Sequence, residues 1–536
     1  MTFAYQRASG GVRLFEGAHF ETAENVRIPD LLSIEWTLLS SIEVSVSLCR
    51  AAFLETPARF SRKRYYMSST ATTPQPGSAK QVNSRGRVIV ASLIGTTVEF
   101  YDFYVYATAA VLVFPRLFFP GQNETTQLLS SFAVFGVAFI ARPLGSIVFG
   151  HFGDKFGRKG TLVASLLTMG IATFLIGCLP TALVPGWEFW APALLVVMRF
   201  AQGLALGGEW SGAALLATEN APANKRAVYG TFPQLGAPIG FIIANVIFLV
   251  FSYALTPEDF VAWGWRVPFL LSAVMVIIGL YVRLKLIETP AFTKVLESNE
   301  VAKLPLARVF KTSWRPLILG TFIMLATYVL FYLMTTFTLT YGTRPATLDA
   351  AKAAAEKAGK PMTEAAAAAF VPGLGYSRND FLWMLIAGVV FFGIFTLVSG
   401  PLAEKWGRRK MLIAVTAGIF VFGLLFVPLF SGGFVGTMAL LIIGFSLMGL
   451  TFGPMGALLP ELFPTNVRYT GSAVSYNVSS ILGAAVAPFI AVWLWEIAKG
   501  SPVLVGVYLT VMSVLTLVAL FLSKETRDLD YENNVA

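Results

Sequence analysis

The sequence is poor in charge, cysteine and histidine. Of its 536 residues 13% are charged and 56% are hydrophobic, whereas soluble domains carry roughly a quarter charged residues. With a mean hydropathy of +0.68, a water-soluble globule is excluded. The two cysteines, Cys49 and Cys178, lie far apart without metal-ligand spacing, and His19 and His151 are the only histidines. We therefore expect no disulfide scaffold, metal site, cofactor or enzymatic activity.

Basic residues outnumber acidic ones, 40 to 30, which gives a formal net charge of +10. A net charge of this sign can indicate a nucleic-acid partner, but no basic patch alternates with aromatic residues, and most Lys and Arg fall between apolar runs. The charge therefore predicts membrane orientation, and no nucleic-acid partner is expected.

Long apolar runs recur from about residue 88 to residue 523. Each is long enough to cross a hydrocarbon core of roughly 30 Å as a helix. The expected fold class is therefore an all-α polytopic membrane protein with twelve transmembrane helices. The apolar segments are residues 88–114, 127–150, 161–180, 191–217, 228–252, 266–283, 316–341, 380–400, 411–430, 436–459, 470–495 and 503–523.

Lys and Arg gather in the loops after the even-numbered segments, which predicts that both termini are cytoplasmic. An Ala-rich insertion, residues 343–376, lengthens one outside loop, and we expect it to be helical in part. The expected divisions are an N-terminal extension (1–66), a cytoplasmic tail (67–87), a six-helix half (88–283), a central cytoplasmic loop (284–315), a second six-helix half (316–523) and a C-terminal tail (524–536).

The first 66 residues differ from the rest. Their apolar stretch, residues 31–54, is interrupted by Glu35 and Glu43, and an acidic residue near a helix centre costs roughly 2.5 to 3.5 kcal/mol on insertion. The order of regions typical of a signal peptide is missing. Met67 opens a polar, low-complexity tail. We interpret Met67 as the natural start and residues 1–66 as non-native or disordered, with a cytoplasmic extension as the alternative.

The chain repeats itself. A charged, glycine-containing loop after the second segment returns after the eighth, and two further pairs of loop residues repeat in the same order. All copies fall in loops expected to be cytoplasmic, so the halves run in the same direction, as in parallel transporter repeats. The loop copies are Gly150, Asp154, Lys155, Gly157, Arg158 and Lys159, then Gly400, Glu404, Lys405, Gly407, Arg408 and Arg409.

This repeated loop joins two helices through a tight turn, where glycine allows the reversal and the charges can pair with one another and with helix ends. An isolated copy could be a solvated turn, but the second copy argues against that reading. The loop resembles the signature G-x-x-x-D-x-x-G-R-[RK] of the major facilitator superfamily, a cytoplasmic gate latch. The second copy departs from the signature with Glu404 in place of Asp.

Charged residues inside the segments are functional candidates because each is costly unless paired or hydrated. Glu99 and Asp102 share one face of segment one by their spacing of three. Arg199 and Glu209 lie in segment four, where glycines permit close helix contact. A carboxylate facing an arginine is a workable proton switch, and a static buried ion pair is the alternative. Arg142, near the cytoplasmic end of segment two, is either a substrate contact or a structural anchor.

Six motifs together resemble the metabolite:H+ symporter family within that superfamily, from about residue 85 to residue 527, and its shikimate-permease-type branch most. They are E-F-Y-D-F-Y-V-Y, A-R-P-L-G, G-H-F-G-D-K-F-G-R-K, R-F-A-Q-G-L-A-L-G-G-E-W-S-G-A, W-R-V-P-F and I-E-T-P-A-F. The resemblance implies the major facilitator fold, import of an organic acid or a zwitterion with H+ across a bacterial inner membrane, and a functional monomer. It also implies that Asp102 and Arg199 form the proton-coupling pair, with Glu99 and Glu209 as further candidates.

Polar-tipped residues inside otherwise apolar segments are candidates for the substrate path. For each tyrosine, an aromatic belt at the membrane interface is the alternative. Gln234 and Asn477 are the stronger candidates. The complete substrate set is Tyr101, Tyr106, Arg142, Gln202, Gln234, Tyr328, Tyr332, Tyr476 and Asn477.

Two rival functions remain at the level of the sequence. Drug antiporters of the superfamily carry a G-P-x-x-G-G element in helix five, and residues 236–240, G-A-P-I-G, fit it only in part. A membrane sensor would need a soluble output domain, which the chain lacks. Import of a small metabolite is therefore favoured over proton-coupled efflux and over sensing.

Overall fold

The computed structural model describes residues 85–121, 123–156, 158–207, 209–284, 305–357, 362–464 and 467–529. All of them belong to one compact unit, Lys80–Ala536. The N-terminal extension and most of the central loop lie outside the described residues, as does Gly157. The side chains of residues 150–156 and 158–162 are also outside the description, so the expected latch residues Asp154, Arg158 and Lys159 have only a described backbone.

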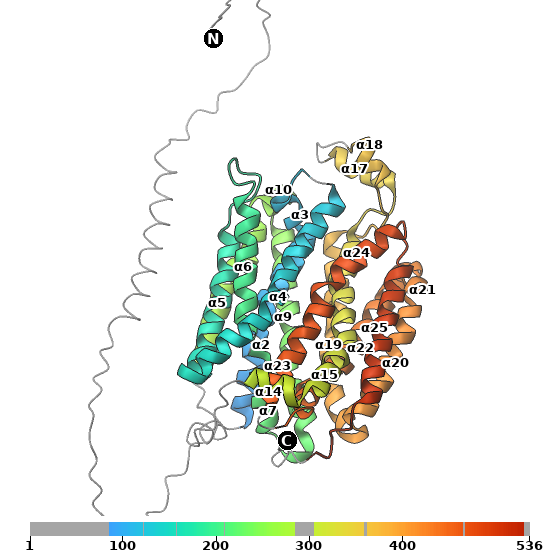
Figure 1. Cartoon of the computed structure of the whole chain (residues 1–536). Helices are drawn as coiled ribbons and strands as arrows, with labels where there is room; N and C mark the ends of the chain where they lie inside the picture. The colour runs from blue at the N-terminus through green and yellow to red at the C-terminus, as the bar shows by residue number, and fades with distance from the viewer. Residues whose placement is uncertain are drawn as a thin grey trace, which may run out of the picture. The chain divides into compact units, whose positions relative to one another are not determined.

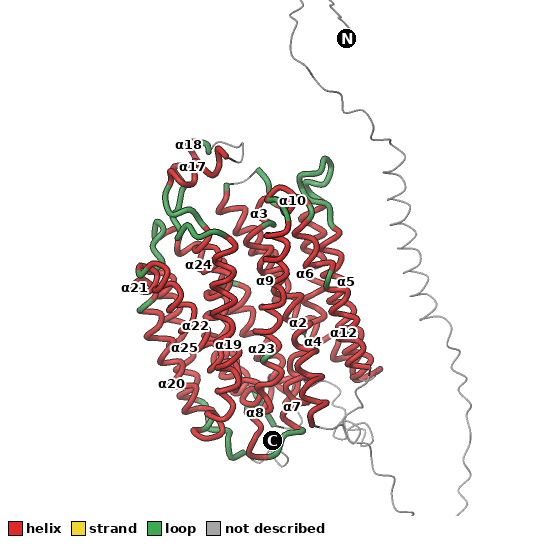
Figure 2. Tube along the Cα trace, turned by 180° about the vertical axis from the view of Figure 1, so that it is seen from behind, coloured by secondary structure: helices red, strands yellow, loops and turns green. Residues whose placement is uncertain are grey.

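Helices account for the whole membrane region, as the apolar runs predict. Among the described residues, nine helical spans are long and apolar enough to cross a membrane. The remaining three expected segments are the helices α2, α5 and α20. The expected count of twelve spans is confirmed, and the described residues contain no strand (Figure 2).

Several spans are built from two or three consecutive helical pieces. The first half comprises α2 (Arg85–Leu112), α3 (Phe114–Phe118), α4 (Glu124–Phe156), α5 (Arg158–Cys178), α6 (Trp190–Leu206), α7 (Glu209–Glu219), η1 (Ala223–Lys225), α8 (Arg226–Gln234), α9 (Gly236–Ala254), α10 (Pro257–Ala262), η2 (Gly264–Arg266), α11 (Val267–Leu270) and α12 (Ser272–Leu284).

The second half begins after the central loop. It comprises α14 (Pro305–Thr312), α15 (Trp314–Tyr332), η3 (Leu333–Phe337), α16 (Thr338–Thr343), α17 (Leu348–Lys357), α18 (Glu364–Ala368), α19 (Arg378–Trp406), α20 (Arg408–Leu424), α21 (Phe426–Ser431), α22 (Gly433–Glu461), α23 (Arg468–Ser480), η4 (Ile481–Ala485), α24 (Ala487–Ile497) and α25 (Val503–Leu522). The insertion is helical in part, as expected, through α17 and α18.

The helices run between two ends of the bundle (Figure 1). We call them the α14 end, where the last described residues also lie, and the α17 end, which carries α10, α17 and α18. The halves meet along α4, α8 and α9 of the first half and α19, α22, α23 and η4 of the second. Residues on these faces are the ones that a substrate between the halves could touch.

Glycines bring α4 and α6 into close contact, as the sequence indicated. A Cβ at Gly203 would collide with the backbone of Ala138, and one at Gly207 would collide with the carbonyl of Arg142. Backbones that approach this closely pack through small residues, the usual solution in a membrane. The contact fixes the position of Arg142 relative to α6.

Candidate functional site

Buried charge is concentrated in the first half. Glu99, Asp102, Arg142, Arg199 and Glu209 expose between 0% and 7% of their surface. Charged groups at this depth are costly unless they are paired, bonded or neutralised. The contacts of each therefore indicate what it can do.

Asp102 and Arg199 do not form the direct ion pair expected from the sequence. The Arg199 Nη1 donates to Gln202 Oε1 at 2.7 Å, and the Gln202 Nε2 donates to Thr173 Oγ1 at 2.7 Å. The Thr173 hydroxyl lies near the Asp102 carboxyl but donates to the carbonyl of Met169 at 3.0 Å, and neither Asp102 oxygen has a hydrogen-bond partner among the described residues. Gln202 and Thr173 therefore form a buried relay of hydrogen bonds that leads from Arg199 towards Asp102 and ends at Thr173.

Two further contacts hold the Arg199 guanidinium inside the first half. Its Nη2 donates to the carbonyl of Phe135 at 3.0 Å, and its Cζ lies 3.9 Å from the ring centroid of Tyr106. Guanidinium groups stack favourably on aromatic faces. Tyr106 therefore supports Arg199, and it does so from within the first half.

Glu209 pairs with an arginine that the sequence reading missed. Its carboxylate forms an ion pair with Arg283 near the end of α12 and accepts from Ser165 Oγ at 3.3 Å. Glu99 lies within electrostatic reach of Arg283 and of Arg142. The two acids and two arginines form one charge cluster across α2, α4, α7 and α12.

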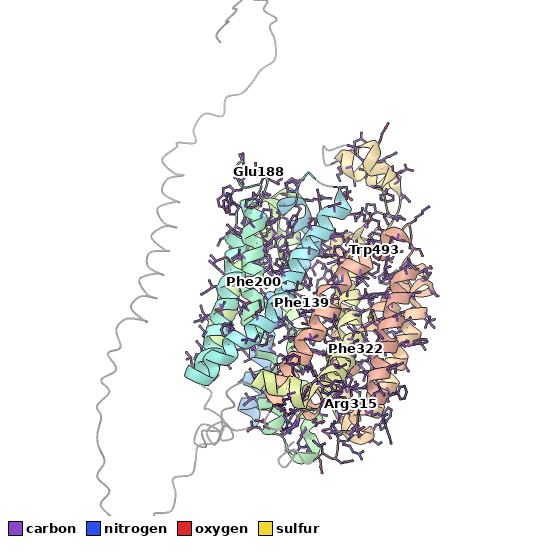
Figure 3. All side chains as sticks on the ribbon, in the orientation of Figure 1. Phe139, Glu188, Phe200, Arg315, Phe322 and Trp493 are labelled. Carbon is purple, nitrogen blue, oxygen red and sulfur yellow. The ribbon has the colours of Figure 1, made fainter. Side chains whose placement is uncertain are left out.

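Arg142 occupies a different position from the one that its segment suggested. Helix α4 continues to Phe156, so Arg142 is near the middle of the helix and not near its end. Its Cζ lies 4.7 Å from the ring centroid of Phe139. Figure 3 labels Phe139 midway between Glu188 and Arg315, which lie at opposite ends. Arg142 thus lies inside the bundle, within the apolar span Glu124–Phe149.

Tyrosines from both halves surround Arg142. Its guanidinium lies within electrostatic reach of four hydroxyl groups, those of Tyr104 of α2 and of Tyr328, Tyr332 and Tyr476 of the second half. Among the described residues, the guanidinium forms no hydrogen bond or ion pair, and its Nε is buried without a partner. A buried, unpaired cation with hydroxyl groups around it can bind an anion.

An aromatic stack joins the two halves of the bundle between Arg142 and the α14 end. Trp210 and Tyr476 lie face to face, with ring centroids 3.9 Å apart at an interplanar angle of 7°. The Trp210 Nε1 donates to Gln234 Oε1 at 3.1 Å, and Gln234 Nε2 donates to the carbonyl of Phe452 at 3.1 Å. The stack on Tyr476 and the hydrogen bond to Phe452 join the first half to the second, whereas the bond between Trp210 and Gln234 lies within the first half.

Asn477 adds a further bridge at this level. Its Nδ2 donates to Ser146 Oγ at 3.0 Å and to the carbonyl of Gly207 at 2.7 Å. Gln234 and Asn477, the two amides singled out in the sequence, therefore bridge the halves in this structure. Their roles in substrate binding remain predictions.

The second copy of the charged loop forms a network of ion pairs at the α14 end, here called the latch, whose role in gating remains a prediction. Arg408 pairs with Glu404 at 2.7 Å and with Glu461 at 3.3 Å. Glu404 Oε1 also accepts from the backbone N–H of Ala227 at 2.6 Å, at the start of α8. A carboxylate is stabilised at a helix N-terminus. Glu404 therefore ties the second half to the first.

A carboxylate that was not expected from the sequence supports this latch. Glu525 accepts from the backbone N–H groups of Arg408 and Arg409 at 2.8 and 3.0 Å, and so caps α20. Gly407, just before this helix, has φ +91°, a conformation that favours glycine. Arg409 donates to the carbonyl of Leu520 at 2.9 Å, at the end of α25.

The halves are also joined at the α17 end. Glu124 pairs with Arg344 at 3.4 Å, and Ser252 Oγ donates to Asn379 Oδ1 at 2.7 Å. Arg344 belongs to the insertion, so this segment supplies part of the contact. The halves therefore have polar contacts with each other at both ends of the bundle.

Tyr101 is the substrate candidate that the structure turns away from the interface. Its hydroxyl donates to the carbonyl of Pro268 at 2.6 Å, within the first half. This bond explains the burial of Tyr101 without a ligand. The residues that the sequence reading did not include in the site are Tyr104, Thr173, Trp210, Arg283, Glu461 and Glu525. Arg283 carried a signal as a charge at the end of an apolar run, and Glu461 and Glu525 carried one as members of the repeated pairs of loop residues.

The fold is that of the major facilitator superfamily. A crystal structure of a D-xylose–proton symporter matches it with a TM-score of 0.60 at 17% identity, over 83% of this chain and 98% of that chain. An inward-open structure of the Escherichia coli xylose transporter matches with a TM-score of 0.54 at 15% identity, over 82% and 95%. Residues 87–317 and 368–534 match the model of the sugar (and other) transporter family, and the chain belongs to that family.

Three relatives of the chain are named as transport proteins for different substrates. The chain is 55% identical to an inner membrane metabolite transport protein of Escherichia coli (strain K12), over 86% of this chain and 99% of that protein. It is 33% identical to the shikimate transporter of the same strain, over 86% and 100%. It is 30% identical to the proline/betaine transporter of Salmonella typhimurium, over 82% and 83%.

Proposed function

We propose that this transporter imports a small organic acid together with H+ across the inner membrane, and that the α14 end and both termini face the cytoplasm. The observation that carries the proposal is Arg142, a buried guanidinium at the interface between the halves, with no polar partner among the described residues. An anion that bound there would complete its coordination.

The proton site in this proposal is Asp102. It exposes 1% of its surface, and within the described part of the chain no basic side chain forms an ion pair with it. A carboxyl in such surroundings releases its proton more readily when a cation approaches, because the cation stabilises the carboxylate. The relay of Thr173 and Gln202 gives Arg199 a means to act on Asp102 when the helices shift.

Alternating access supplies the coupling. The bridges at the α14 end and those at the α17 end would open in turn, as one half rocks against the other. Names of relatives agree with a metabolite substrate, since one is called a shikimate transporter and another a proline/betaine transporter. The first supports an organic acid, and the second keeps a zwitterion as the alternative.

The test is uptake into liposomes that contain the purified full chain. An inward proton gradient should drive accumulation of labelled shikimate, or of another acid from a panel that includes malate, citrate, proline and glycine betaine. Dissipating the gradient with a protonophore should stop accumulation. Proton-driven loss of a preloaded substrate would instead establish efflux.

A further inference from the structure

Two exposed aromatic residues mark the ends of two spans at the α14 end of the second half. The span Arg378–Trp406 ends at Trp406, and the span Val503–Leu522 ends one residue after Phe521. Trp406 and Phe521 expose 51% and 58% of their surface. Exposed aromatic side chains at the end of a span lie at the level of the lipid headgroups.

Three lysines lie next to these aromatic residues. Lys405 precedes Trp406, Lys524 follows Phe521 by three positions, and Lys410 lies in the first turn of α20. All three lysines are exposed, and within the described part of the chain none of them forms an ion pair or a side-chain hydrogen bond. We call these five residues the lysine–aromatic surface.

Hydrogen bonds bring the ends of α19, α20 and α25 together beneath this surface. Arg409 Nη2 donates to the carbonyl of Phe521 at 2.8 Å, and Arg527 Nη1 donates to the carbonyl of Lys405 at 3.3 Å. The cap that Glu525 forms on α20 adds a third connection. The three lysines are therefore held at one edge of the second half, where α20 and α25 lie side by side (Figure 1).

The acids on the same elements are already committed to other partners. Glu404 pairs with Arg408, and Glu525 accepts from the backbone N–H of Arg408. Asp528 pairs with Arg527 at 2.9 Å. The described acids therefore leave the charge of the three lysines uncompensated, and a phosphate group is the kind of ligand that complements it.

An apolar stripe on α25 leads to the lysine–aromatic surface. Its members recur at intervals of three and four residues, so they share one face of the helix. The stripe is about 21 Å long, which exceeds the depth of one leaflet, half of a hydrocarbon core of roughly 30 Å. Its exposed residues are Val507, Val511, Val514, Val518 and Phe521.

We propose that the lysine–aromatic surface binds the headgroup of an anionic phospholipid from the leaflet at the α14 end. Lys405, Lys410 and Lys524 contact the phosphate, and an acyl chain lies along the stripe of α25. Basic side chains at the end of a span are attracted to anionic lipid. The site belongs to the second half alone, apart from the region around Arg142, so it does not depend on the substrate or on the direction of transport.

The stripe distinguishes a lipid from a soluble anion. Free phosphate would contact the lysines and gain nothing from α25, whereas a phospholipid would contact both. A phospholipid with a choline headgroup would contact the stripe but would bring its own cation to the lysines. Anionic phospholipid is therefore expected to bind more tightly than either.

The first experiment locates the lipid by lysine labelling. The purified full chain in a neutral detergent is mixed with dioleoylphosphatidylglycerol, dioleoylphosphatidylcholine or inorganic phosphate, treated with a water-soluble acylating ester, and read by mass spectrometry. Phosphatidylglycerol should slow labelling of the three lysines several-fold, and the other two additives should not. Equal protection by phosphate or by phosphatidylcholine would overturn the proposal. The comparison lysines, exposed and away from the α14 end, are Lys352, Lys357 and Lys499.

The second experiment removes the charges. Changing Lys405, Lys410 and Lys524 together to Gln should weaken phosphatidylglycerol binding by about 100-fold, because each lysine near an anionic surface contributes a factor of roughly five. Changing all three to Arg should retain binding. Binding is followed as the shift of the thermal unfolding midpoint, after each variant has been melted without lipid.

The matched control changes the three comparison lysines to Gln, which alters the net charge of the chain by the same amount. It should leave phosphatidylglycerol binding unchanged. An equal loss in the control, or no loss in the variant of the lysine–aromatic surface, would contradict a site at this place.

The C-terminal segment is the other occupant that the test must separate. Residues 530–536, outside the described part of the chain, include the acids Asp530 and Glu532. The proposal predicts that Asp530→Asn combined with Glu532→Gln leaves both the labelling without lipid and the protection by phosphatidylglycerol as in the parent. Lysines that label faster in this variant without lipid, and bind phosphatidylglycerol only then, would show that the segment occupies the surface and would overturn the proposal.

Discussion

Arg199 and Asp102 form no ion pair among the described residues, and two neutral side chains, Gln202 and Thr173, lie between them. All four residues are buried, with at most 2% of their surface exposed. A direct ion pair would hold the Asp102 carboxyl charged. The relay keeps the carboxyl free to exchange a proton while Arg199 stays bonded.

Removing the relay should therefore uncouple the proton from the substrate. Gln202→Leu leaves the Arg199 Nη1 without its acceptor, and a hydrogen bond to a charged group contributes about 1.5 to 3 kcal/mol. We expect proton-driven uptake to fall by about 10-fold or more, with its pH profile displaced, while counterflow exchange persists. Thr108→Val, which breaks the buried bond of 2.9 Å to Asn245 in the same half, is the control. An unaltered pH profile in Gln202→Leu would show that the relay is only structural.

The latch at the α14 end should set the balance between open and closed forms. Glu404→Ala removes the acceptor of the Ala227 N–H and one partner of Arg408. We expect the inner side to open more often, so that a cysteine introduced at Gln234 reacts faster with a membrane-impermeant maleimide from the cytoplasmic side. Reactivity equal to that of the parent would mean that Glu404 does not hold the halves together.

The first copy of the loop allows a parallel prediction. Asp154→Asn removes one charge from the motif that includes Arg158 and Lys159. We expect transport to fall by about 10-fold while the amount of protein in the membrane stays the same. Wild-type uptake rates in this variant would identify the loop as a turn without a gating role.

The stack of Trp210 on Tyr476 should separate binding from gating. Tyr476→Phe keeps the ring and loses the hydroxyl near Arg142, so we expect weaker substrate binding with an intact closed state. Tyr476→Leu also loses a stack, and aromatic pairs contribute about 0.5 to 1.5 kcal/mol beyond their buried area. It should in addition increase leak of substrate towards the cytoplasm. Identical behaviour of the two variants in binding and leak assays would contradict the division of roles.

Much of the architecture could be predicted from the sequence, because a helix that crosses lipid must be long and apolar. The twelve segments and the partial helix in the insertion were therefore expected. The boundaries were less accurate. The apolar run ends at residue 150, whereas α4 extends to Phe156, because the last turns of this helix carry charged residues that a search for apolar runs leaves out. That extension moved Arg142 from an expected helix end to a central position.

The site was harder to predict because it depends on how each helix is rotated. Asp102 and Arg199 were found as charges in apolar segments, but Thr173 and Gln202 lie between them only in three dimensions. Tyr101, adjacent in sequence to Asp102, points about 100° away around the helix, and its hydroxyl bonds to Pro268. Trp210 gave no signal because an aromatic residue in an apolar segment resembles any other core residue.

Accumulation by the Asp102→Asn variant tests the central claim most directly. Asparagine mimics a permanently protonated carboxyl, so the variant should bind substrate and exchange it in counterflow, but should not concentrate it in liposomes under an inward proton gradient. Arg199→Ala should impair both activities because it removes the charge at the other end of the relay. Accumulation by Asp102→Asn against a gradient, with the pH dependence of the parent protein, would contradict the account and move proton coupling to Glu99 or Glu209.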